Sequence, residues 1–474
     1  MSESENFATA TPEDLDYRDD RVMDEESRLR PEFVDEVLDA VEVGDDETAR
    51  ELVKPLHPAD VADLIELARR DEREGLVKAL AGIISPEVLA ELNDYVREDL
   101  IDEMEPQQVA DLAGQMETDD AVALIEDLDE EDQQAVLEKM EPDDRAAVVE
   151  ALSYPEESAG RLMQRDLCAV PAHWKVGQVI DYLRSESDLP DDFWEVFVVN
   201  PDHHPVGTCK LSTILRKPRT TLVGDIMTKE QTLIPVDMDQ EDVALRFQKY
   251  ALVSAAVVDG DGRLVGMITV DDIVHIIQEE AGEDVLLLSG AGDEGDINEP
   301  VIESYKSRVR WLITNLGTAL VASTIISLFE GAIAQLVILA ALMPIVAGVG
   351  GNAGTQTLAV TVRALATNQL TGSNRWRAVG REMRVALLNG GTVALILGVG
   401  VALVFHNPLL GGVIAVAMCA NILVAGTVGS LVPLTLERFG VDPAVGSSIF
   451  VTMMTDSMGF LLFLGLAVAT GLVG

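Results

Sequence analysis

The chain has 474 residues, with 82 acidic and 34 basic side chains, and its formal net charge is −48. Such an excess of carboxylates argues against nucleic-acid binding, because phosphate recognition requires Lys and Arg. The three cysteines, Cys168, Cys209 and Cys419, lie far apart and form no CxxC pair, so neither a disulfide scaffold nor a zinc site is predicted.

The charge is distributed unevenly along the chain. From residue 301 onward there are six acids and nine bases, which leaves 76 acids and 25 bases in residues 1–300. We therefore expect a very acidic soluble half joined to an apolar, slightly basic half. Cation binding and halophilic adaptation, in which acidic surfaces keep a protein soluble in concentrated salt, both produce such acidity, and halophilic adaptation explains most of it. The total charge is thus weak evidence for a metal site.

The first part of the chain is predicted to be an acidic tail followed by a helical domain. Residues 1–30 are polar and acidic and are expected to be disordered. They contain no basic n-region and no apolar h-region, so no signal peptide is predicted and the acidic half is expected in the cytoplasm. Over residues 31–155 a proline recurs two residues after an apolar residue, at 56–64, 104–112 and 140–148. Because proline favours the first helical turn, this predicts short helices in a solenoid-like domain, and an ordinary helical bundle fits the pattern too.

Residues 158–288 contain an internal duplication. Ala-Gly-Arg-Leu-Met at 159–163 recurs as Val-Gly-Asp-Ile-Met at 223–227. Val-Gly-Thr-Cys at 206–209 recurs as Val-Gly-Met-Ile at 265–268. Each copy has the pattern of a strand, a helix, a second strand, a Gly-led third strand and a last helix, which predicts two small α/β domains.

The two copies resemble a tandem pair of cystathionine-β-synthase (CBS) domains, over residues 156–220 and 221–288. This regulatory module often binds adenosine nucleotides such as ATP, or metal ions. In the family a Thr/Ser-x-x-Asp element holds the ribose, and the second copy has Thr269 and Asp272 at that spacing. The first copy has Lys and Thr at the corresponding positions. The resemblance implies at most one nucleotide site, and a purely structural pair fits equally well.

The rest of the chain is predicted to span a membrane. A helix needs about 20 apolar residues to cross a bilayer, and uncharged runs of this length recur here. Five transmembrane helices are predicted, at about residues 311–329, 334–363, 385–405, 410–435 and 445–472. A connecting (plug-like) helix is expected at 289–310 and a transmembrane domain at 311–474. The predicted fold class is therefore multidomain, with a cytosolic α-helical domain, α/β tandem CBS domains and an all-α polytopic membrane domain.

Basic residues mark one side of the predicted bundle. They are Arg308, Arg310, Arg363, Arg375, Arg377, Arg381, Arg384 and Arg438. The positive-inside rule assigns this side to the cytoplasm. We therefore expect a multi-pass protein of the cell (plasma) membrane, with its soluble half inside and, after five crossings, its C-terminus outside.

Asp456 is the only charged residue between Pro443 and Gly474. An ionisable group at membrane depth is costly, so it normally faces a bundle interior or an aqueous path. The same half carries the run Gly-Val-Gly-Gly-Asn-Ala-Gly-Thr-Gln at 348–356. A carboxylate beside unusually mobile backbone predicts a cation-conducting membrane protein. Small residues also serve close helix packing in membranes, and this alternative stays open for the glycines.

The order of domains and the motifs resemble the MgtE family of magnesium channels. The glycine-rich run is followed by Arg-Ala-Leu-Ala-Thr at 363–367, Val-Asp-Pro at 441–443 and Thr-Asp-Ser-Met-Gly at 455–459. The resemblance covers nearly the whole chain. It implies a homodimer in the lipid bilayer whose pore between subunits takes up Mg²⁺, and no enzyme activity or catalytic residue is expected.

The resemblance implies that Asp456 is the essential pore ligand. Magnesium is small, prefers six oxygen ligands and gives up water reluctantly, so carboxylate and carbonyl oxygens suit it. Gly350 and Gly351 would let the backbone approach the pore, and Asn352 would add an amide oxygen. Glu330, at the outer end of the first predicted helix, would gather cations, although a solvated loop acid explains it as well.

The resemblance also implies a gate. In the family, magnesium bound between acidic faces of the helical domain, the CBS pair and the connecting helix favours a closed state. The candidate regulatory ligands are Asp119, Asp120, Asp271, Asp272, Glu280, Glu283 and Asp284. His275 departs from the pattern, which has an acid at that position, and a solvated surface role is the alternative for each single acid.

Three other functions compete with this one. The first is transport of another divalent cation, such as Co²⁺, Mn²⁺ or Ca²⁺, although the predicted helices hold no His or Cys cluster for a transition metal. The second is a CBS-based nucleotide-sensing membrane receptor, which has no need of the buried Asp456. The third is an intramembrane aspartyl protease. Such an enzyme needs two catalytic acids, and only one acid lies within a predicted transmembrane helix.

Overall fold

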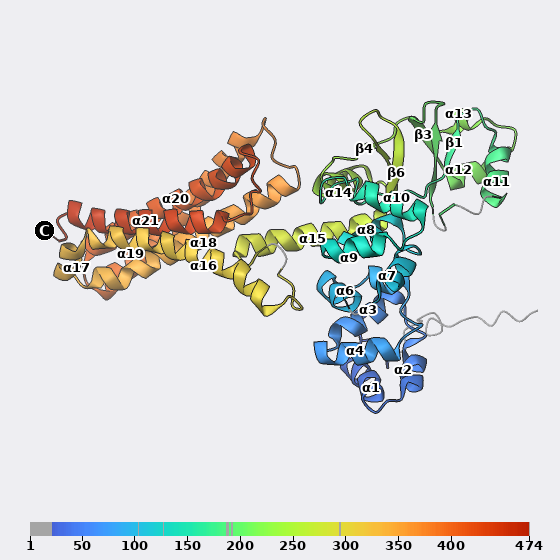
Figure 1. The fold of residues 1–474 in the computed structure, drawn as a ribbon. Helices are drawn as coiled ribbons and strands as arrows, with labels where there is room; N and C mark the ends of the chain where they lie inside the picture. Colours follow the sequence, from blue (N-terminus) through green and yellow to red (C-terminus); the bar gives the residue numbers. More distant parts are fainter. Residues whose placement is uncertain are drawn as a thin grey trace, which may run out of the picture. The chain divides into compact units, whose positions relative to one another are not determined.

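The structure, a computed structural model, describes residues 21–473 apart from 103, 127, 186–188, 191–192 and 293–294. It divides into two compact units, Met1–Ile273 and Val274–Gly474. The first unit contains a helical domain and two small sheets, and the second contains five long helices (Figure 1). We call them the soluble unit and the membrane unit.

The structure describes only part of the tail that was expected to be disordered. Residues 1–20 of it lie outside the described residues. Residues 21–30 are ordered, which corrects the prediction for this stretch. Met23 pairs with Leu29 across a turn, and the Asp24 carboxylate accepts the backbone N–H groups of Glu26 and Arg28, each at 2.9 Å. Leu29 is buried in the helical domain, which ties the segment down.

The helical domain consists of short helices between residues 31 and 151. They are α1 Pro31–Glu42, α2 Asp46–Val53, α3 Pro58–Leu67, α4 Arg70–Ala79, α5 Pro86–Ala90, α6 Asp94–Ile101, α7 Pro106–Ala113, α8 Thr118–Glu126, α9 Glu130–Leu137 and α10 Pro142–Ala151. The recurrent prolines of the sequence start α3, α7 and α10, as predicted, because a first-turn proline lacks only an N–H that the helix does not use.

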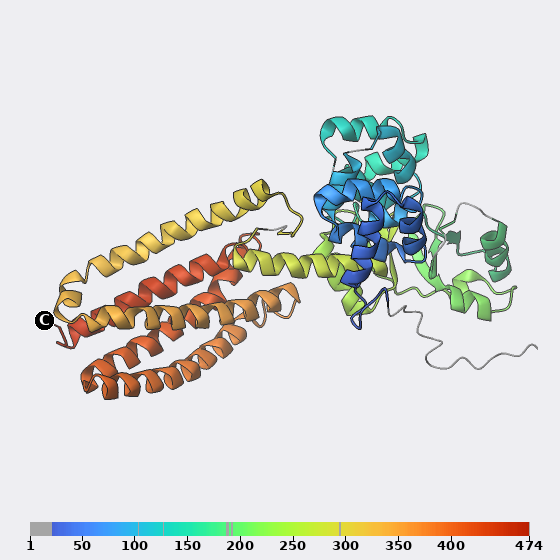
Figure 2. The same cartoon turned by 90° about the horizontal axis from the view of Figure 1, so that it is seen from below.

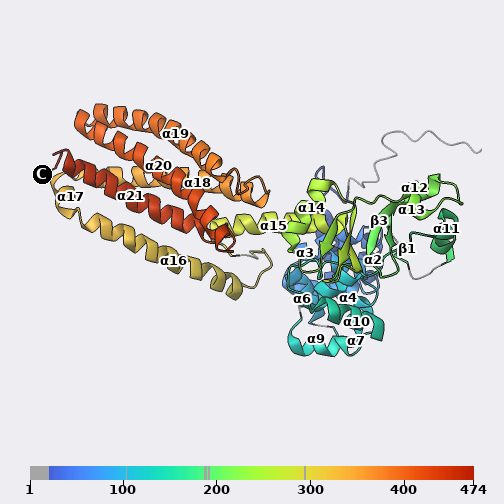
Figure 3. The same ribbon diagram turned by 90° about the horizontal axis from the view of Figure 1, so that it is seen from above.

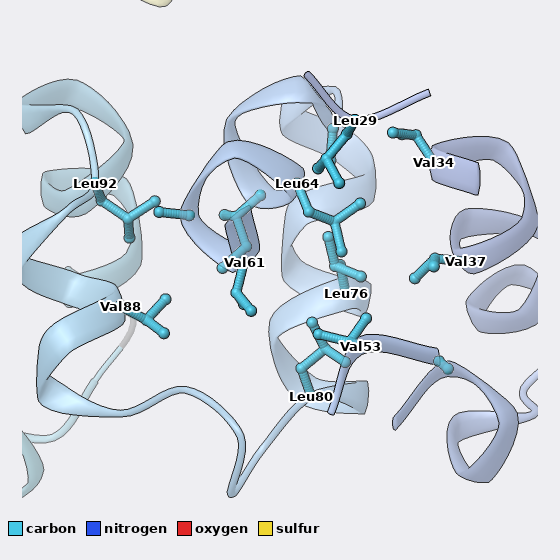
Figure 4. Packing of buried hydrophobic residues seen from close by; sticks show 14 of the residues in the cluster. Leu29, Val34, Val37, Val53, Val61, Leu64, Leu76, Leu80, Val88 and Leu92 are labelled. Atoms are coloured by element: carbon cyan, nitrogen blue, oxygen red, sulfur yellow. The ribbon is translucent and has the colours of Figure 1, made fainter. Parts of the chain in front are cut away.

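Two apolar clusters hold these helices together. The first is built by α1–α6, and Figure 4 shows Val37, Val53, Leu64 and Leu76, from α1, α2, α3 and α4, together with Leu80, which directly follows α4. All five are fully buried, and burying one such side chain is worth about 1.5–3 kcal/mol. The second cluster is built by the residues from the end of α6 to α10. Packing, rather than helix propensity, therefore stabilises helices this short.

The two sheets confirm the duplication. Their strands are β1 Ala169–Pro171, β2 Glu195–Val199, β3 Pro205–Lys210, β4 Leu233–Pro235, β5 Ser254–Val258 and β6 Leu264–Thr269. The helices around them are α11 Val176–Ser185, α12 Leu211–Arg216, α13 Val223–Ile226 and α14 Gln240–Tyr250. In both sheets the first pair is parallel and the second antiparallel, with a register shift at Val198/Val199 and at Val257/Val258.

Each copy also reaches into the sheet of the other. Gln164, which precedes the first sheet, forms a bridge with Met267 of β6. Thr228, which precedes the second sheet, forms a bridge with Thr208 of β3. The two copies are therefore one interlocked pair.

The helix expected at 289–310 is not a separate element, and this prediction is corrected. Helix α15 runs over Val270–Ser289, and helix α16 over Val301–Ser327. Gly290 and Gly292 adopt positive φ and end α15, while Pro300 caps the start of α16. The connecting helix is thus the extended last helix of the second CBS copy, and the first membrane helix begins ten residues earlier than predicted.

The membrane unit has five helices long and apolar enough to cross a membrane, as predicted. They are α16 Val301–Ser327, α18 Ile338–Ala366, α19 Arg375–Val404, α20 Pro408–Arg438 and α21 Ser447–Ala469, with the short α17 Glu330–Gln335 between the first two. The most apolar stretch of α20 is 56% buried, whereas that of α16 is 6% buried. Helix α20 is therefore the centre of the bundle, and α16 runs along its edge (Figures 2 and 3).

Candidate cation sites

The glycine-rich run predicted to approach a pore lies in the middle of α18. There it packs against α20 and α21 with almost no side chain between the backbones. A Cβ atom on Gly354 would lie 2.5 Å from Cγ1 of Val451, and one on Gly429 would lie 2.7 Å from the carbonyl oxygen of Gly354. Small residues allow such close approach, which brings the α18 backbone beside α21.

Asp456 lies near the middle of α21. Its side chain is half-buried, and its neighbours Thr455 and Ser457 are buried. Within the described residues, no hydrogen bond or ion pair joins the Asp456 carboxylate to another group. A carboxylate without a cationic partner in an apolar bundle is expensive, which favours a role with a mobile cation.

The other predicted pore residues are placed unequally around this carboxylate. Gly351 is half-buried, and a Cβ on it would lie 4.0 Å from Oγ1 of Thr455, the neighbour of Asp456. Gly350 is buried against Asn421 of α20, and Asn352 is exposed. Glu330 is exposed at the start of α17. The structure therefore brings Gly351 to the helix that carries Asp456, packs Gly350 against α20, and leaves Asn352 and Glu330 on the surface of the chain.

A second group of carboxylates lies within the soluble unit, where the start of α8 meets the start of α15. We call Glu117, Asp119, Asp120, Asp271 and Asp272 the carboxylate cluster. Its polar contacts converge on Asp272, whose Oδ2 accepts hydrogen bonds from Oγ1 of Thr269 at 2.8 Å and from Nε2 of Gln164 at 3.4 Å. Gln164 also donates to Glu117. One amide thus links carboxylates of the helical domain and of the CBS pair.

Burial and mutual repulsion make these negative charges costly. Burial, together with Asp272 and Asp120, raises the pKa of Glu117 to about 7. Burial raises the pKa of Asp272 to about 6, and it raises that of Asp119 well above its usual value. Oδ1 of Asp119 is buried and has no hydrogen-bond partner in the described part of the chain. A bound cation would relieve this repulsion.

The cluster is not a ready-made metal site. Among the described residues, no three His, Cys, Asp or Glu side chains converge closely enough to hold a metal ion. To hold a cation, this cluster would therefore have to bind it through waters of its hydration shell, or its side chains would have to rearrange. Magnesium commonly keeps several of its waters when one or two carboxylates hold it.

The remaining predicted regulatory residues belong to the membrane unit. Burial raises the pKa of Asp284, and Asp442, in the loop before α21, adds to the rise. Glu280 and Glu283 lie on the same part of α15 and are half-buried. His275 is exposed. The structure thus places Asp284 next to Asp442 and adds Asp442 to the candidates.

The predicted nucleotide element coincides with the carboxylate cluster. Thr269 is buried, and its hydroxyl donates a hydrogen bond to the Asp272 carboxylate. Asp272 therefore serves both predicted sites.

Sequence reasoning missed Glu117, Gln164 and Asp442 as members of these groups. The one sequence signal for Glu117 is the stretch Met-Glu-Thr-Asp-Asp at 116–120, where Thr replaces the recurrent proline and two more acids follow. Nothing near Gln164 in the sequence indicates a partner more than 100 residues away.

Three family descriptions match parts of this chain. The MgtE divalent cation transporter family matches residues 343–466, the MgtE intracellular N domain matches 56–157, and the CBS domain matches 223–279. The first CBS copy lies outside these matches, and its strand order nevertheless equals that of the second.

Named relatives match most of the chain. A magnesium transporter MgtE of Enterococcus faecalis is 37% identical over 88% of this chain and 92% of its own length. A magnesium transporter MgtE of Thermus thermophilus is 34% identical over 66% of this chain and 70% of its own. A solved cytosolic domain of the Mg²⁺ channel MgtE in complex with ATP is 26% identical, covers 51% of this chain and 99% of its own, and has a TM-score of 0.48.

Proposed function

The chain belongs to the MgtE family of magnesium transporters, and on that premise we propose that it is a homodimeric, Mg²⁺-selective channel for magnesium uptake that intracellular Mg²⁺ closes. Members of this family are transporters and not enzymes, and the chain is a multi-pass membrane protein. The proposal extends this to the pore, the gate and the orientation in the membrane.

The observation that carries the proposal is the Asp456 carboxylate. It is half-buried in an apolar helix, and no basic group among the described residues neutralises it. Two such side chains facing each other across a dimer axis would offer two negative charges to a divalent cation. Without the cation the two carboxylates repel each other, so a bound divalent cation would remove this electrostatic repulsion.

The backbone around this carboxylate suits a hydrated ion. Gly351 lies beside Thr455, so the α18 backbone passes close to the turn of α21 that carries Asp456. Gly350 and Asn352 complete this part of the pore in the proposal, and Glu330 at the outer end of the bundle gathers cations. Magnesium in such a pore keeps part of its water shell.

The proposed gate is the carboxylate cluster, together with the acids of α15 in the membrane unit. Cations that bind the compact arrangement more tightly than an open one shift the population toward it. The raised pKa values of Glu117, Asp119 and Asp272 support this, because they mark carboxylates whose charge the compact arrangement does not otherwise neutralise. One adenosine nucleotide such as ATP, bound at Thr269 and Asp272, would compete with the cation for the same carboxylate.

The proposed orientation places the soluble unit in the cytoplasm and the C-terminus outside. The arginines near the ends of α18, α19 and α20 support it, since they fall on the side at which α16 begins. Arg375 of α19 pairs with Glu437 of α20 at 2.6 Å on this side.

A second candidate is transport of another divalent cation, such as Co²⁺, Mn²⁺ or Ca²⁺. The family description names a divalent cation transporter and no single cation, which agrees with this second candidate. A predominantly oxygen-based pore disfavours a soft transition metal but not Ca²⁺ or Mn²⁺.

The test is cation flux into liposomes that carry the purified full chain. We expect Mg²⁺ flux that exceeds Na⁺ and Ca²⁺ flux, that Asp456→Ala abolishes and that the isosteric Asp456→Asn also abolishes. Loss in both variants assigns the effect to the charge and not to the shape of the side chain. Equal flux in wild type and both variants would remove Asp456 from the mechanism, and Ca²⁺ or Mn²⁺ flux above Mg²⁺ flux would favour the second candidate.

A further inference from the structure

Asn421 is unlike most other buried polar residues of the membrane unit. It lies in the middle of α20, and its side chain is completely buried. The buried hydroxyls of Thr357, Thr361 and Ser430 donate one turn back to a carbonyl of their own helix. Asn421 instead donates from Nδ2 to the carbonyl oxygen of Val346 on α18, at 3.1 Å. Its polar group thus joins two helices.

The Asn421 amide also fills the space that two glycines leave open. A Cβ on Gly350 of α18 would overlap Nδ2 and lie 3.0 Å from Cγ of Asn421. A Cβ on Gly459 of α21 would lie 2.7 Å from Nδ2 and 3.2 Å from Cγ. The flat amide is therefore held between the backbones of α18 and α21, and no larger residue at either glycine fits beside it.

One half of the amide is unsatisfied. Oδ1 of Asn421 is buried and has no hydrogen-bond partner in the described part of the chain. Burying an unpaired acceptor is costly, and an apolar side chain of similar size would fill the space without that cost. Simple space filling is therefore an incomplete explanation of an amide at this position.

The two glycines flank the proposed pore residues. Gly350 directly precedes Gly351, and Gly459 follows Asp456 by three residues on α21. We infer that Asn421 is a positioning residue for the pore, which sets the separation of α18 and α21 and hence the distance from the Gly351 backbone to the Asp456 carboxylate. It acts through these helices and does not itself bind the cation. The inference rests on the proposed function.

The experiment shortens the side chain of Asn421 and adds a methyl group at a glycine that contacts it. Asn421→Ala removes the amide, and Gly350→Ala adds a methyl group where the amide lies. In the double variant the new methyl group occupies the space that the amide has left. The readouts are the Mg²⁺:Ca²⁺ flux ratio in liposomes, the half-saturating Mg²⁺ concentration and the thermal unfolding midpoint of the purified full chain.

We expect each single variant to weaken Mg²⁺ preference or half-saturation by roughly 10–100-fold, the usual effect of losing a group that orients a metal ligand. The double variant should recover most of that loss. Gly459→Ala, alone and with Asn421→Ala, repeats the test from α21 if a first pair fails to fold. Ser430→Ala and Gly465→Ala serve as matched controls, since the Ser430 hydroxyl bonds its own helix and a Cβ on Gly465 meets nothing within 4 Å.

The outcomes separate the inference from the function on which it rests. Folded single variants with a lower unfolding midpoint but wild-type flux ratio and half-saturation would make Asn421 a structural residue only and overturn the inference. Double variants no better than the singles would overturn it as well. No Mg²⁺ flux in wild type, or full flux in Asp456→Ala, would instead reject the proposed function.

Discussion

The soluble unit and the membrane unit each contain carboxylates for which we propose a cation, in opposite surroundings. Residues 1–300 carry 76 acids, so acidity there says little about any one of them. What distinguishes Glu117, Asp119 and Asp272 is partial desolvation together with repulsion from neighbouring acids, which raises their pKa values. In the membrane unit a single acid, Asp456, interrupts the last helix, and its presence alone is informative.

A carboxylate therefore indicates a cation site for a different reason in each unit. Where acids are abundant, only the cost of holding a particular charge indicates function. Where acids are otherwise absent, as in the last membrane helix, a single acid already indicates function. A salt-adapted surface explains solvated acids that lie apart and does not explain a cluster of partly desolvated acids that repel each other.

The largest effect expected in the soluble unit comes from Asp272→Asn. The amide keeps the size of the side chain and an oxygen for Thr269, but it is a poor magnesium ligand. The Mg²⁺ concentration that half-closes the channel should rise roughly 10–100-fold. Flux into liposomes at graded Mg²⁺ on the soluble-unit side measures it. Asp132→Asn, at an exposed acid of α9, is the matched control, and an equal shift in both variants would mean that only overall charge matters.

A smaller effect is expected from packing in the membrane unit. Gly354→Val places side-chain atoms where Cγ1 of Val451 lies, 2.5 Å from the Cβ position. Overpacking of this kind costs about 1–3 kcal/mol, so the unfolding midpoint of the purified chain should fall. Gly391→Val, on α19, where a Cβ meets nothing within 4 Å, should leave it unchanged. An unchanged midpoint in Gly354→Val would contradict the close approach of α18 and α21.

The stability of the soluble unit should depend on pH through Glu117. Glu117 has an ordinary pKa of 4.5, and in the folded chain it is about 7. Between these values the folded state binds more protons than the unfolded state, so stability is highest at low pH and falls as pH rises through this window. Without divalent cations, the unfolding midpoint of the soluble unit should therefore drop from pH 5 to pH 7. Saturating Mg²⁺ should flatten this slope, and Glu117→Gln should reduce it. A midpoint that rises over the same range would contradict the cluster.

The smallest effect is expected from the ion pair of Arg375 and Glu437. The two side chains are each about one-third exposed and lie 2.6 Å apart. Such partly exposed pairs contribute about 0–1 kcal/mol. Arg375→Gln should therefore shift the unfolding midpoint by little and leave Mg²⁺ flux intact. A loss of flux would assign this pair a role that the account does not include.

Much of the fold was predictable because its signals are local. First-turn prolines mark the starts of α3, α7 and α10, and uncharged runs mark the five membrane helices. The duplicated strands were predictable from their repeated glycine positions. The connecting helix was misplaced because nothing in the periodicity distinguishes the end of a CBS helix from its extension to Ser289.

The candidate sites were predictable only where the residue type was unusual for its surroundings. Asp456 stands out in any apolar helix. Gln164 and Asn421 are ordinary residues in their own stretches, and their importance comes from contacts with Asp272 and Val346, more than 70 residues away in each case. Such pairing depends on how helices and sheets pack, which no local pattern encodes.

The central claim is that one carboxylate of the membrane unit conducts the cation while the carboxylate cluster of the soluble unit senses it. The most direct test is Mg²⁺ flux at low and at high Mg²⁺ on the soluble-unit side, for wild type, Asp456→Asn and Asp272→Asn. The account predicts that wild-type flux falls at high Mg²⁺, that Asp456→Asn conducts at neither concentration, and that Asp272→Asn still conducts at the high one. Flux through Asp456→Asn, or closure of Asp272→Asn at the wild-type concentration, would contradict it.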